Sequence, residues 1–255
     1  MSLPSFDRFK EIVDKFPALD PVMVLGDVGV DKYTFGTVDR ISPEAPVPVV
    51  AVTKEWNKLG LAANVSDNLI GLDIKNYLCG VIGADHHAEV LLNLMRDSGL
   101  SVDAMIKANR RTTFKERVVT NVQQICRVDY ESKKNLSDSE VSTVEDKLNS
   151  FWDKISAVII EDYGKGMLNE KLCQWSIQQA RQQGKLVVVD PSRRTNPFFF
   201  KGASLLKPNQ VETKVICEKL GYHEDNVEHM ASLLLDKLEL DMVIITLGPK
   251  GMGSM

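Results

Sequence analysis

Short apolar runs alternate along the chain with stretches in which apolar residues recur every three or four positions. The runs fall at 22–25, 76–82, 157–160, 185–190, 203–206 and 242–246. Several are rich in Val and Ile, as expected for parallel strands buried on both faces. The intervening stretches, such as 227–238, place their apolar residues on one helical face. This alternation predicts an α/β fold in which helices cover both faces of a mostly parallel central sheet.

Two segments break the alternation. Residues 33–56 carry three prolines and then a β-rich stretch, and residues 111–129 alternate apolar and polar positions as strands do. Neither segment contains a helical pattern. We predict that they form a small β-layer over the carboxyl ends of the main strands, where ligands of α/β proteins usually bind. Residues 1–255 would then be one domain with this layer as its lid.

Composition narrows the class of protein. The 255 residues are 44% hydrophobic and 26% charged with a net charge of −4, which argues against nucleic acid as the main partner. The apolar runs are far shorter than the roughly 18 residues of a membrane span, and the first 16 residues read as an amphipathic helix instead of a signal peptide. We therefore expect no membrane association and a cytoplasmic protein. Three of the four cysteines lie in apolar runs or helical patterns, which predicts buried thiols, and the spacing of the cysteines and histidines predicts no structural metal.

Polar residues follow several of the predicted strands. Asp27 and Asp31 lie in "VLGDVGVDKY", where one aspartate could simply close a turn, but two of them four residues apart indicate a ligand. "EDYGKGML" (161–168) is equally typical of a plain strand-to-helix connection. "LGLAANVSDNLIGL" (59–72) reads as a glycine turn feeding a helix, which suits an anion or a hydroxyl but also an ordinary helix start.

Three further observations concern nucleotides. Neither GxxxxGK[ST] nor GxGxxG occurs, so the common phosphate loop and the dinucleotide fingerprint are missing. In "LLKPNQVE" (205–212), Asn209 and Glu212 have the spacing of a capping box, and they could also organise magnesium, its waters and a phosphate. The glycine-rich end of "VIITLGPKGMG" (243–253) could lie flat against a nucleotide, which is weak support by itself.

Taken together, these motifs resemble those of the ribokinase-like (PfkB) carbohydrate kinases, and among them the D-glycero-β-D-manno-heptose-7-phosphate 1-kinases of bacterial ADP-heptose and lipopolysaccharide synthesis. The most specific match is "GTVDRISPEAPVPVV" (36–50). The others occur in the family's order, as "GD…DKY", "AANV", "TTFKERV", "QQICRVD", "DYGKG", "VVDP" and "KPNQVE". The resemblance implies a ribokinase-like three-layer sandwich with a β-lid, ATP and Mg²⁺ as cofactors, and phosphorylation of heptose 7-phosphate at O1.

The resemblance also implies roles for individual residues. Asp27, Asp31, Gly60 and Asn64 would hold the sugar, and a basic set on the lid, Arg111, Lys115, Arg117 and Arg127, would grip its 7-phosphate. The nucleotide would meet Asp162, Lys165, Asp190, Asn209, Glu212, Thr246, Gly248 and Gly251, with Glu212 reaching magnesium through water. The lids of this family commonly form a dimer contact, so a homodimer is expected.

Three departures from the family pattern stand out. The second glycine of a Gly-Gly pair is Leu61 here, where a branched side chain would crowd the sugar or displace the turn. The family's "VDPKG" reads "VDPSRR", so Ser192 replaces a lysine. The family's Gly-Ala-Gly-Asp motif, whose Asp is the catalytic base, has no equivalent within residues 1–255, so the resemblance places that base beyond Met255. We therefore expect no catalytic residue within this chain and no activity from it alone.

Two alternatives remain open at this point. The altered residue at position 61 leaves room for a kinase of the same type that acts on another sugar. A catalytically silent protein that binds sugar phosphates would share most of the same motifs.

Overall fold

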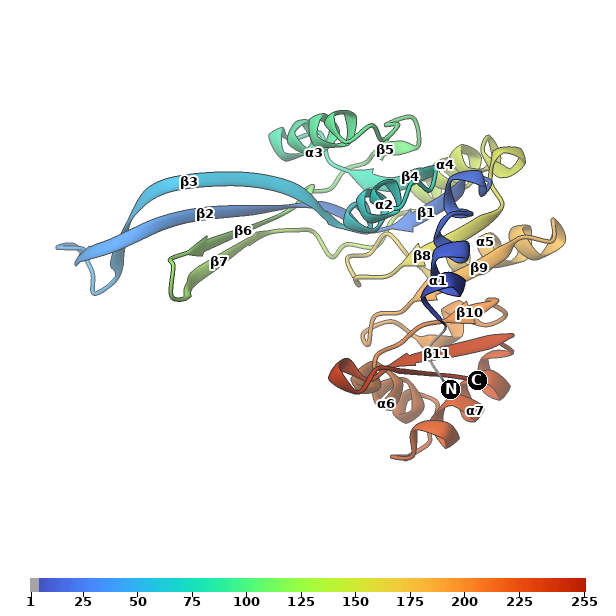
Figure 1. Ribbon diagram of the computed structural model, residues 1–255. Helices are drawn as coiled ribbons and strands as arrows, with labels where there is room; N and C mark the ends of the chain where they lie inside the picture. Colours follow the sequence, from blue (N-terminus) through green and yellow to red (C-terminus); the bar gives the residue numbers. More distant parts are fainter. Residues whose placement is uncertain (1–4) are drawn as a thin grey trace.

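The computed structural model describes residues 5–255, which form a large α/β body and a smaller sheet that projects from it (Figure 1). The body is built on an eight-stranded sheet in the order β12-β11-β10-β9-β8-β1-β4-β5. Neighbouring strands in this sheet run parallel, except that β12 is antiparallel to β11. The strands are β1 (Val22–Gly26), β4 (Asn76–Ile82), β5 (Met105–Lys107), β8 (Ala157–Glu161), β9 (Leu186–Asp190), β10 (Leu205–Leu206), β11 (Met242–Thr246) and β12 (Met252–Ser254).

Helices pack on both faces of this sheet, which confirms the predicted α/β fold. They are α2 (Ala62–Gly71), α3 (His86–Asp97), α4 (Asp138–Asn149), α5 (Glu170–Gln182), α6 (Gln210–Lys219) and α7 (Val227–Leu238), with short 3₁₀ turns at Phe16–Ala18, Trp152–Lys154, Pro197–Phe200 and Gly248–Lys250. Alternate residues of β1 point to opposite faces. Val24 packs with residues of α2 and α3, whereas Met23 and Leu25 join the larger cluster that includes α4, α5 and α7.

The predicted strands agree with the structure, with one difference. The strand predicted at 203–206 is only two residues long in the structure, as β10. The Val187 amide donates to the Ser204 hydroxyl at 3.0 Å, at the position where backbone pairing of the two strands would otherwise continue. Strand β1 pairs with β4 on one side and with β8 on the other. From β1 the chain adds β4 and β5 on one side of the sheet and then β8 and the later strands on the other. Such a switch point opens a crevice at the carboxyl ends of the strands.

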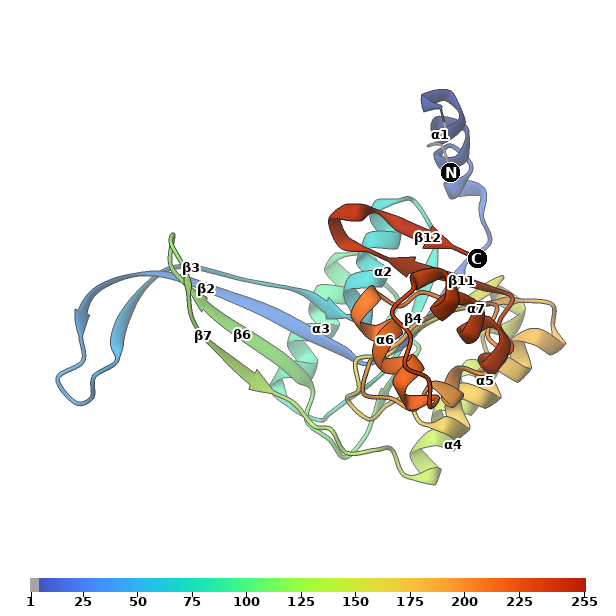
Figure 2. The same ribbon diagram turned by 90° about the horizontal axis from the view of Figure 1, so that it is seen from below.

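The projecting sheet is the lid, and it has the strand order β3-β2-β6-β7. Its strands are β2 (Val28–Ile41), β3 (Pro48–Leu61), β6 (Thr113–Val119) and β7 (Gln124–Tyr130). The segments 33–56 and 111–129 fall within it. The β2–β3 hairpin extends well past β6 and β7 (Figures 1 and 2). Strand β2 begins only two residues after β1 ends, so Asp31 lies on a lid strand and not in a turn.

The N-terminal segment forms the expected amphipathic helix, α1 (Phe6–Val13), which stands away from the body in Figure 2. Cys79, Cys173 and Cys217 are buried free thiols, as predicted, while Cys126 is exposed on the lid. Across residues 5–255, no helix has both the length and the apolar character needed to cross a membrane.

Candidate active site

Two adjoining cavities lie at the carboxyl ends of the central strands. The first, of about 370 Å³, is lined by Glu161, Asp190 and Thr246 from the ends of β8, β9 and β11, and by Lys115 from lid strand β6. The second, of about 470 Å³, shares Thr246 with the first and continues along the start of α6 to Gly248. Volumes of this size suit small ligands. The carboxyl ends of the strands, where a ligand site was predicted, therefore carry a pair of adjoining cavities that share lining residues.

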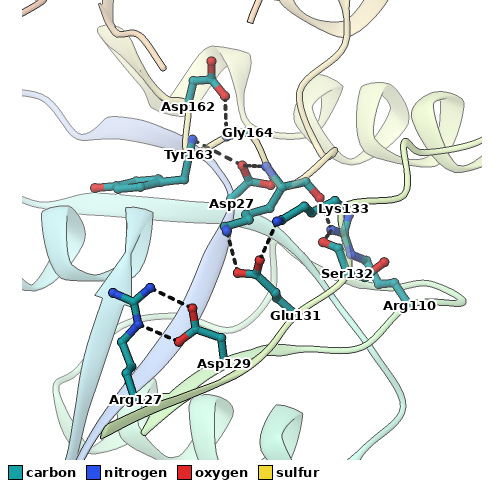
Figure 3. A network of polar contacts seen from close by, with 11 residues as sticks. Asp27, Arg110, Arg127, Asp129, Glu131, Ser132, Lys133, Asp162, Tyr163 and Gly164 are labelled. Carbon is teal, nitrogen blue, oxygen red and sulfur yellow. Dashed lines mark hydrogen bonds and ion pairs between the residues drawn. The ribbon is translucent and has the colours of Figure 1, made fainter. Parts of the chain in front are cut away.

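Asp27 binds the backbone of a neighbouring turn. Its side chain is 3% exposed. One carboxylate oxygen accepts the amides of Tyr163 (Figure 3) and Lys165, at 3.3 and 2.9 Å. The other accepts the amide of Met167 at 3.2 Å. Burial raises the pKa of this carboxyl, although the amide hydrogen bonds act in the opposite direction. Both oxygens are thus occupied by the 163–167 turn, a role that differs from the expected contact with sugar hydroxyls.

Lys165 is held at three points. Besides the bond to Asp27, its carbonyl accepts a hydrogen bond from the Arg110 guanidinium at 2.5 Å. Its ammonium group pairs with Glu131 at 2.5 Å. Glu131 directly follows lid strand β7, so this contact joins the lid to the turn after β8. Figure 3 labels Glu131 and Asp27, which lie close together at this junction.

Asp31 lies at the lid side of the site and accepts a hydrogen bond from Arg117 at 2.5 Å. The Arg117 guanidinium also covers the ring of Tyr33, 5.4 Å from its centre. A Cβ atom on Gly60 would come within 2.9 Å of the Asp31 carboxylate, so glycine at this position lets the carboxylate pack against the β3 backbone. Arg117 therefore neutralises and orients Asp31, whereas it was expected to grip a phosphate.

Lys115 is the basic lid residue that reaches the first cavity. It stands beside Asp31 in the parallel register of β2 and β6. Burial, with the charge of Lys165 nearby, lowers the pKa of Lys115. Among residues 5–255 no carboxylate lies within ion-pair distance of it. The charges of Asp31, Asp129 and Glu131 act on it from a longer distance. A half-buried cation without a direct ion-pair partner favours the binding of an anion, because an ion pair would offset the cost of burial.

Three charged residues follow one another across adjacent strand ends. Glu161 ends β8 beside Asp190 in the register of β9, and Lys207, after β10, donates to Asp190 at 2.7 Å. Glu161 is 5% exposed. Burial and the nearby Asp190 charge raise the pKa of Glu161 to about 8, so this side chain is mainly protonated at neutral pH.

Asn209 and Glu212 form a capping box at the start of α6. The Asn209 side-chain oxygen accepts the Glu212 amide, and one Glu212 oxygen accepts the Asn209 amide, both at 2.9 Å. This is the local alternative that the sequence left open. The capping box uses the Asn209 side-chain oxygen and one Glu212 oxygen. Within residues 5–255 the other Glu212 oxygen accepts no hydrogen bond. Both residues line both cavities.

The structure thus gathers part of the predicted site. The walls of the two cavities include Lys115, Asp162, Lys165, Asp190, Asn209, Glu212, Thr246 and Gly248. Asn64, half-buried on α2, and Arg127, which pairs with Asp129 at 2.9 Å (Figure 3), line neither cavity. Arg111 lies over the ring of Tyr130. Gly251, with a φ of +91°, shapes the turn between β11 and β12.

Met255 extends the edge of the central sheet. Its amide donates to the Val243 carbonyl at 3.0 Å, and its carbonyl accepts the Val243 amide at 2.9 Å. The side chain is 46% exposed, and Met255 lines neither of the two cavities. The β12 segment that leads to it, 252–255, contains no acidic residue, so it brings no carboxylate to the site. The catalytic base expected beyond Met255 lies outside the described residues, and its position stays a prediction.

Some residues of the site carried no signal in the sequence. Arg110 and Glu131 hold Lys165, yet neither belongs to a motif, because their partners are distant in sequence. Arg193 lines both cavities and Arg194 lines the first. The sequence pointed to these arginines only as a departure from "VDPKG".

Comparison with known sequences gives consistent matches. The description "pfkB family carbohydrate kinase" matches residues 28–253. The bifunctional protein HldE of Methylobacillus flagellatus is 40% identical over 249 residues, which cover 96% of this chain and 51% of that protein. HldE of Helicobacter hepaticus is 37% identical over 238 residues, or 91% of this chain and 48% of that protein. The chain spans about half the length of the curated relatives it matches.

Solved structures agree on the fold. Phosphofructokinase-2 from Escherichia coli, in complex with substrates and products, superposes with a TM-score of 0.71 at 19% identity, covering 93% of this chain and 76% of that one. Ribokinase from Arabidopsis thaliana, with ribose and ATP, gives 0.65 at 16% identity, covering 93% and 75%. At such identities the likeness shows the fold alone, and it confirms the ribokinase-like architecture.

Proposed function

The chain belongs to the pfkB family of carbohydrate kinases, and we propose that it binds heptose 7-phosphate and MgATP for phosphoryl transfer to O1 of the sugar, giving heptose 1,7-bisphosphate. The motif at 36–50 supports the choice of sugar, as does 40% identity to a bifunctional protein HldE. This activity would place the protein in ADP-heptose synthesis for lipopolysaccharide, in the cytoplasm, where ATP and sugar phosphates are available.

The observation that carries the proposal is the pairing of Asp31 with Lys115 on adjacent lid strands. Asp31 offers an ionised acceptor for sugar hydroxyls, oriented by Arg117. Lys115 offers a cation without a direct ion-pair partner at the cavity wall for the phosphate of the same substrate. A carboxylate and a lysine side by side match a ligand that carries hydroxyl groups at one end and a phosphate at the other.

The residues of the second cavity fit a nucleotide with magnesium. Magnesium prefers carboxylate and water oxygens, and Glu212 has an oxygen that the capping box leaves without a hydrogen bond. Among residues 5–255 no three acidic, histidine or cysteine side chains gather into a metal site, so the ion would be shared with phosphate oxygens. When bound, it would neutralise charge on the phosphates. Thr246 and Gly248 would face the nucleotide.

The chain's own contribution is mainly placement of the two ligands, as in phosphoryl transfer generally. The O1 proton needs an acceptor, and the carboxylates at the first cavity are poorly suited. Glu161 is mainly protonated, Asp190 pairs with Lys207, and Asp162 accepts backbone amides of Gly164 and Ser192. Glu212, the fourth carboxylate of this cavity, is assigned to magnesium. We therefore expect residues 1–255 alone to bind both ligands without measurable turnover.

Dimerisation through the lid is part of the proposal. The long β2–β3 hairpin exposes large apolar side chains, with Ile41 at 60%, Val52 at 56% and Trp56 at 40%. Exposed apolar side chains gathered on a projecting ribbon are typical of an interface. Sedimentation velocity should show a dimer that Val52→Glu converts to a monomer. A wild-type chain that stays monomeric at high concentration would rule this contact out.

Matched lid variants test the sugar site. Lys115→Met should weaken heptose 7-phosphate binding about tenfold or more and leave unphosphorylated heptose nearly unchanged, because only the phosphate meets this side chain. Arg117→Met should weaken both sugars, since it releases Asp31. Calorimetric titration measures both effects. Equal losses for the two sugars in Lys115→Met would contradict the assignment.

A further inference from the structure

The cations on the wall of the first cavity divide into two groups. Lys165 pairs with Glu131, and Lys207 pairs with Asp190. Lys115, Arg193 and Arg194 line the same cavity, and among residues 5–255 no carboxylate lies within 4.0 Å of their charged groups. Lys115 comes from the lid, whereas both arginines come from the turn after β9. The cavity thus has cations without a direct ion-pair partner on two separate walls.

The turn that carries the arginines is fixed at both ends. Asp162 accepts the Ser192 amide at 3.1 Å and the Gly164 amide at 2.8 Å, and so joins two turns. The Ser192 hydroxyl accepts the Arg194 amide at 3.2 Å. At the far end, Lys219 of α6 donates to the Thr195 carbonyl at 2.8 Å. These bonds use the backbone, which leaves the guanidinium groups available.

The position of Arg193 indicates which ligand it meets. Arg193 lines the second cavity as well as the first, where it faces the Asn209–Glu212 helix start and the Thr246–Gly248 segment. Lys115 does not line the second cavity. Arg193 is therefore on the nucleotide side and Lys115 on the sugar side, while Arg194, the next residue of the same turn, lines the first cavity beside Arg193.

We propose that Arg193 and Arg194 are phosphate-binding residues for the nucleotide, so that the turn 192–195 presents two guanidinium groups to the oligophosphate chain where the two cavities meet. This inference rests on the proposed function. Guanidinium groups bind phosphate oxygens in pairs through parallel hydrogen bonds. Ser192, which stands where a lysine was expected, builds the turn, and the two arginines supply the charge.

Calorimetric titration of the 255-residue chain with MgATP tests the proposal. Arg193→Gln and Arg194→Gln should each weaken MgATP binding about tenfold, and the double variant more. Heptose 7-phosphate affinity should stay within about twofold. MgATP binding by the wild type should weaken as salt is added, and the double variant should lose most of this dependence. Arg96→Gln is the matched control, because Arg96 is exposed on α3 and, among residues 5–255, its side chain bonds only to Asn93 of the same helix.

The outcomes separate this inference from the proposed function. Wild-type protein that binds no MgATP would contradict the proposed function and this inference together. Wild-type binding with unchanged affinity in the double variant would overturn the arginine assignment alone. Equal losses for MgATP and heptose 7-phosphate would also overturn it, since the arginines would then not distinguish the two ligands. Thermal melting should show that the variants remain folded, because the turn is held through its backbone.

Discussion

At the scale of single residues, Leu61 adopts a conformation that glycine tolerates best. Its φ is +58° and its ψ is −136°, directly before α2. A side chain in this region costs about 1–3 kcal/mol, and the position is where the family pattern has glycine. The side chain is 9% exposed, so its burial offsets part of that cost. The sequence analysis expected a branched side chain at position 61 to crowd the sugar or displace the turn. In the structure Leu61 keeps the backbone conformation with positive φ that suits glycine.

We predict that Leu61→Ala is less stable than Leu61→Gly. Both variants lose the buried side chain, but only glycine relieves the strain, so the glycine variant should be more stable by about 1 kcal/mol. Urea unfolding of the two variants measures the difference. At an ordinary position alanine is favoured over glycine, so an alanine variant of higher stability would show that Leu61 is unstrained.

Glu161 gives the protein a pH-dependent stability. Its pKa is about 8 in the folded state against 4.5 ordinarily, so between these values the folded protein holds a proton that the unfolded chain releases. Stability therefore falls as pH rises through this window, by at most about 1.4 kcal/mol per pH unit. Glu161→Gln should remove this decline. Its stability relative to wild type, measured by urea unfolding, should increase from about pH 5 to about pH 8. Parallel curves for the two proteins would exclude this role for Glu161.

At the scale of elements, Asp27 connects the end of β1 to the turn after β8. Asp27→Asn replaces an acceptor by an amide group that cannot accept all three backbone N–H groups, so it should cost about 2–3 kcal/mol of unfolding free energy. Asp31→Asn should cost less than about 1 kcal/mol, because its ion pair is partly exposed, while weakening heptose 7-phosphate binding about tenfold or more. Comparable stability losses in the two variants would contradict the division of roles between these aspartates.

Elements with strong periodicity were predictable from the sequence, and their mutual placement was not. The buried strands and α7 follow from local apolar patterns, which depend on neighbours in the chain. The pairing of β2 with β6 joins residues more than 80 positions apart, so no local pattern specifies it. For the same reason Asp27 looked like a ligand for sugar: its partners at 163–167 are known only once β1 and β8 are adjacent. The capping box at Asn209 was readable, because both of its partners lie within four residues.

At the scale of the whole molecule, the site depends on two sheets meeting. The central sheet supplies the strand ends and the nucleotide side, whereas the lid supplies Asp31 and Lys115. Glu131 and Lys165 tie the two together at the root of the lid. Family membership and fold account for a carbohydrate kinase, and the lid chemistry supports the proposal that its substrate already carries a phosphate.

The most direct measurement is a calorimetric comparison of three sugars on the wild-type chain: heptose 7-phosphate, the same heptose without phosphate, and fructose 6-phosphate. Binding does not require a catalytic base, so the result does not depend on turnover. We predict that heptose 7-phosphate binds at least about tenfold more tightly than either of the others, a difference of about 1.4 kcal/mol. Equal or tighter binding of fructose 6-phosphate, or no binding of heptose 7-phosphate, would contradict the assignment of this site.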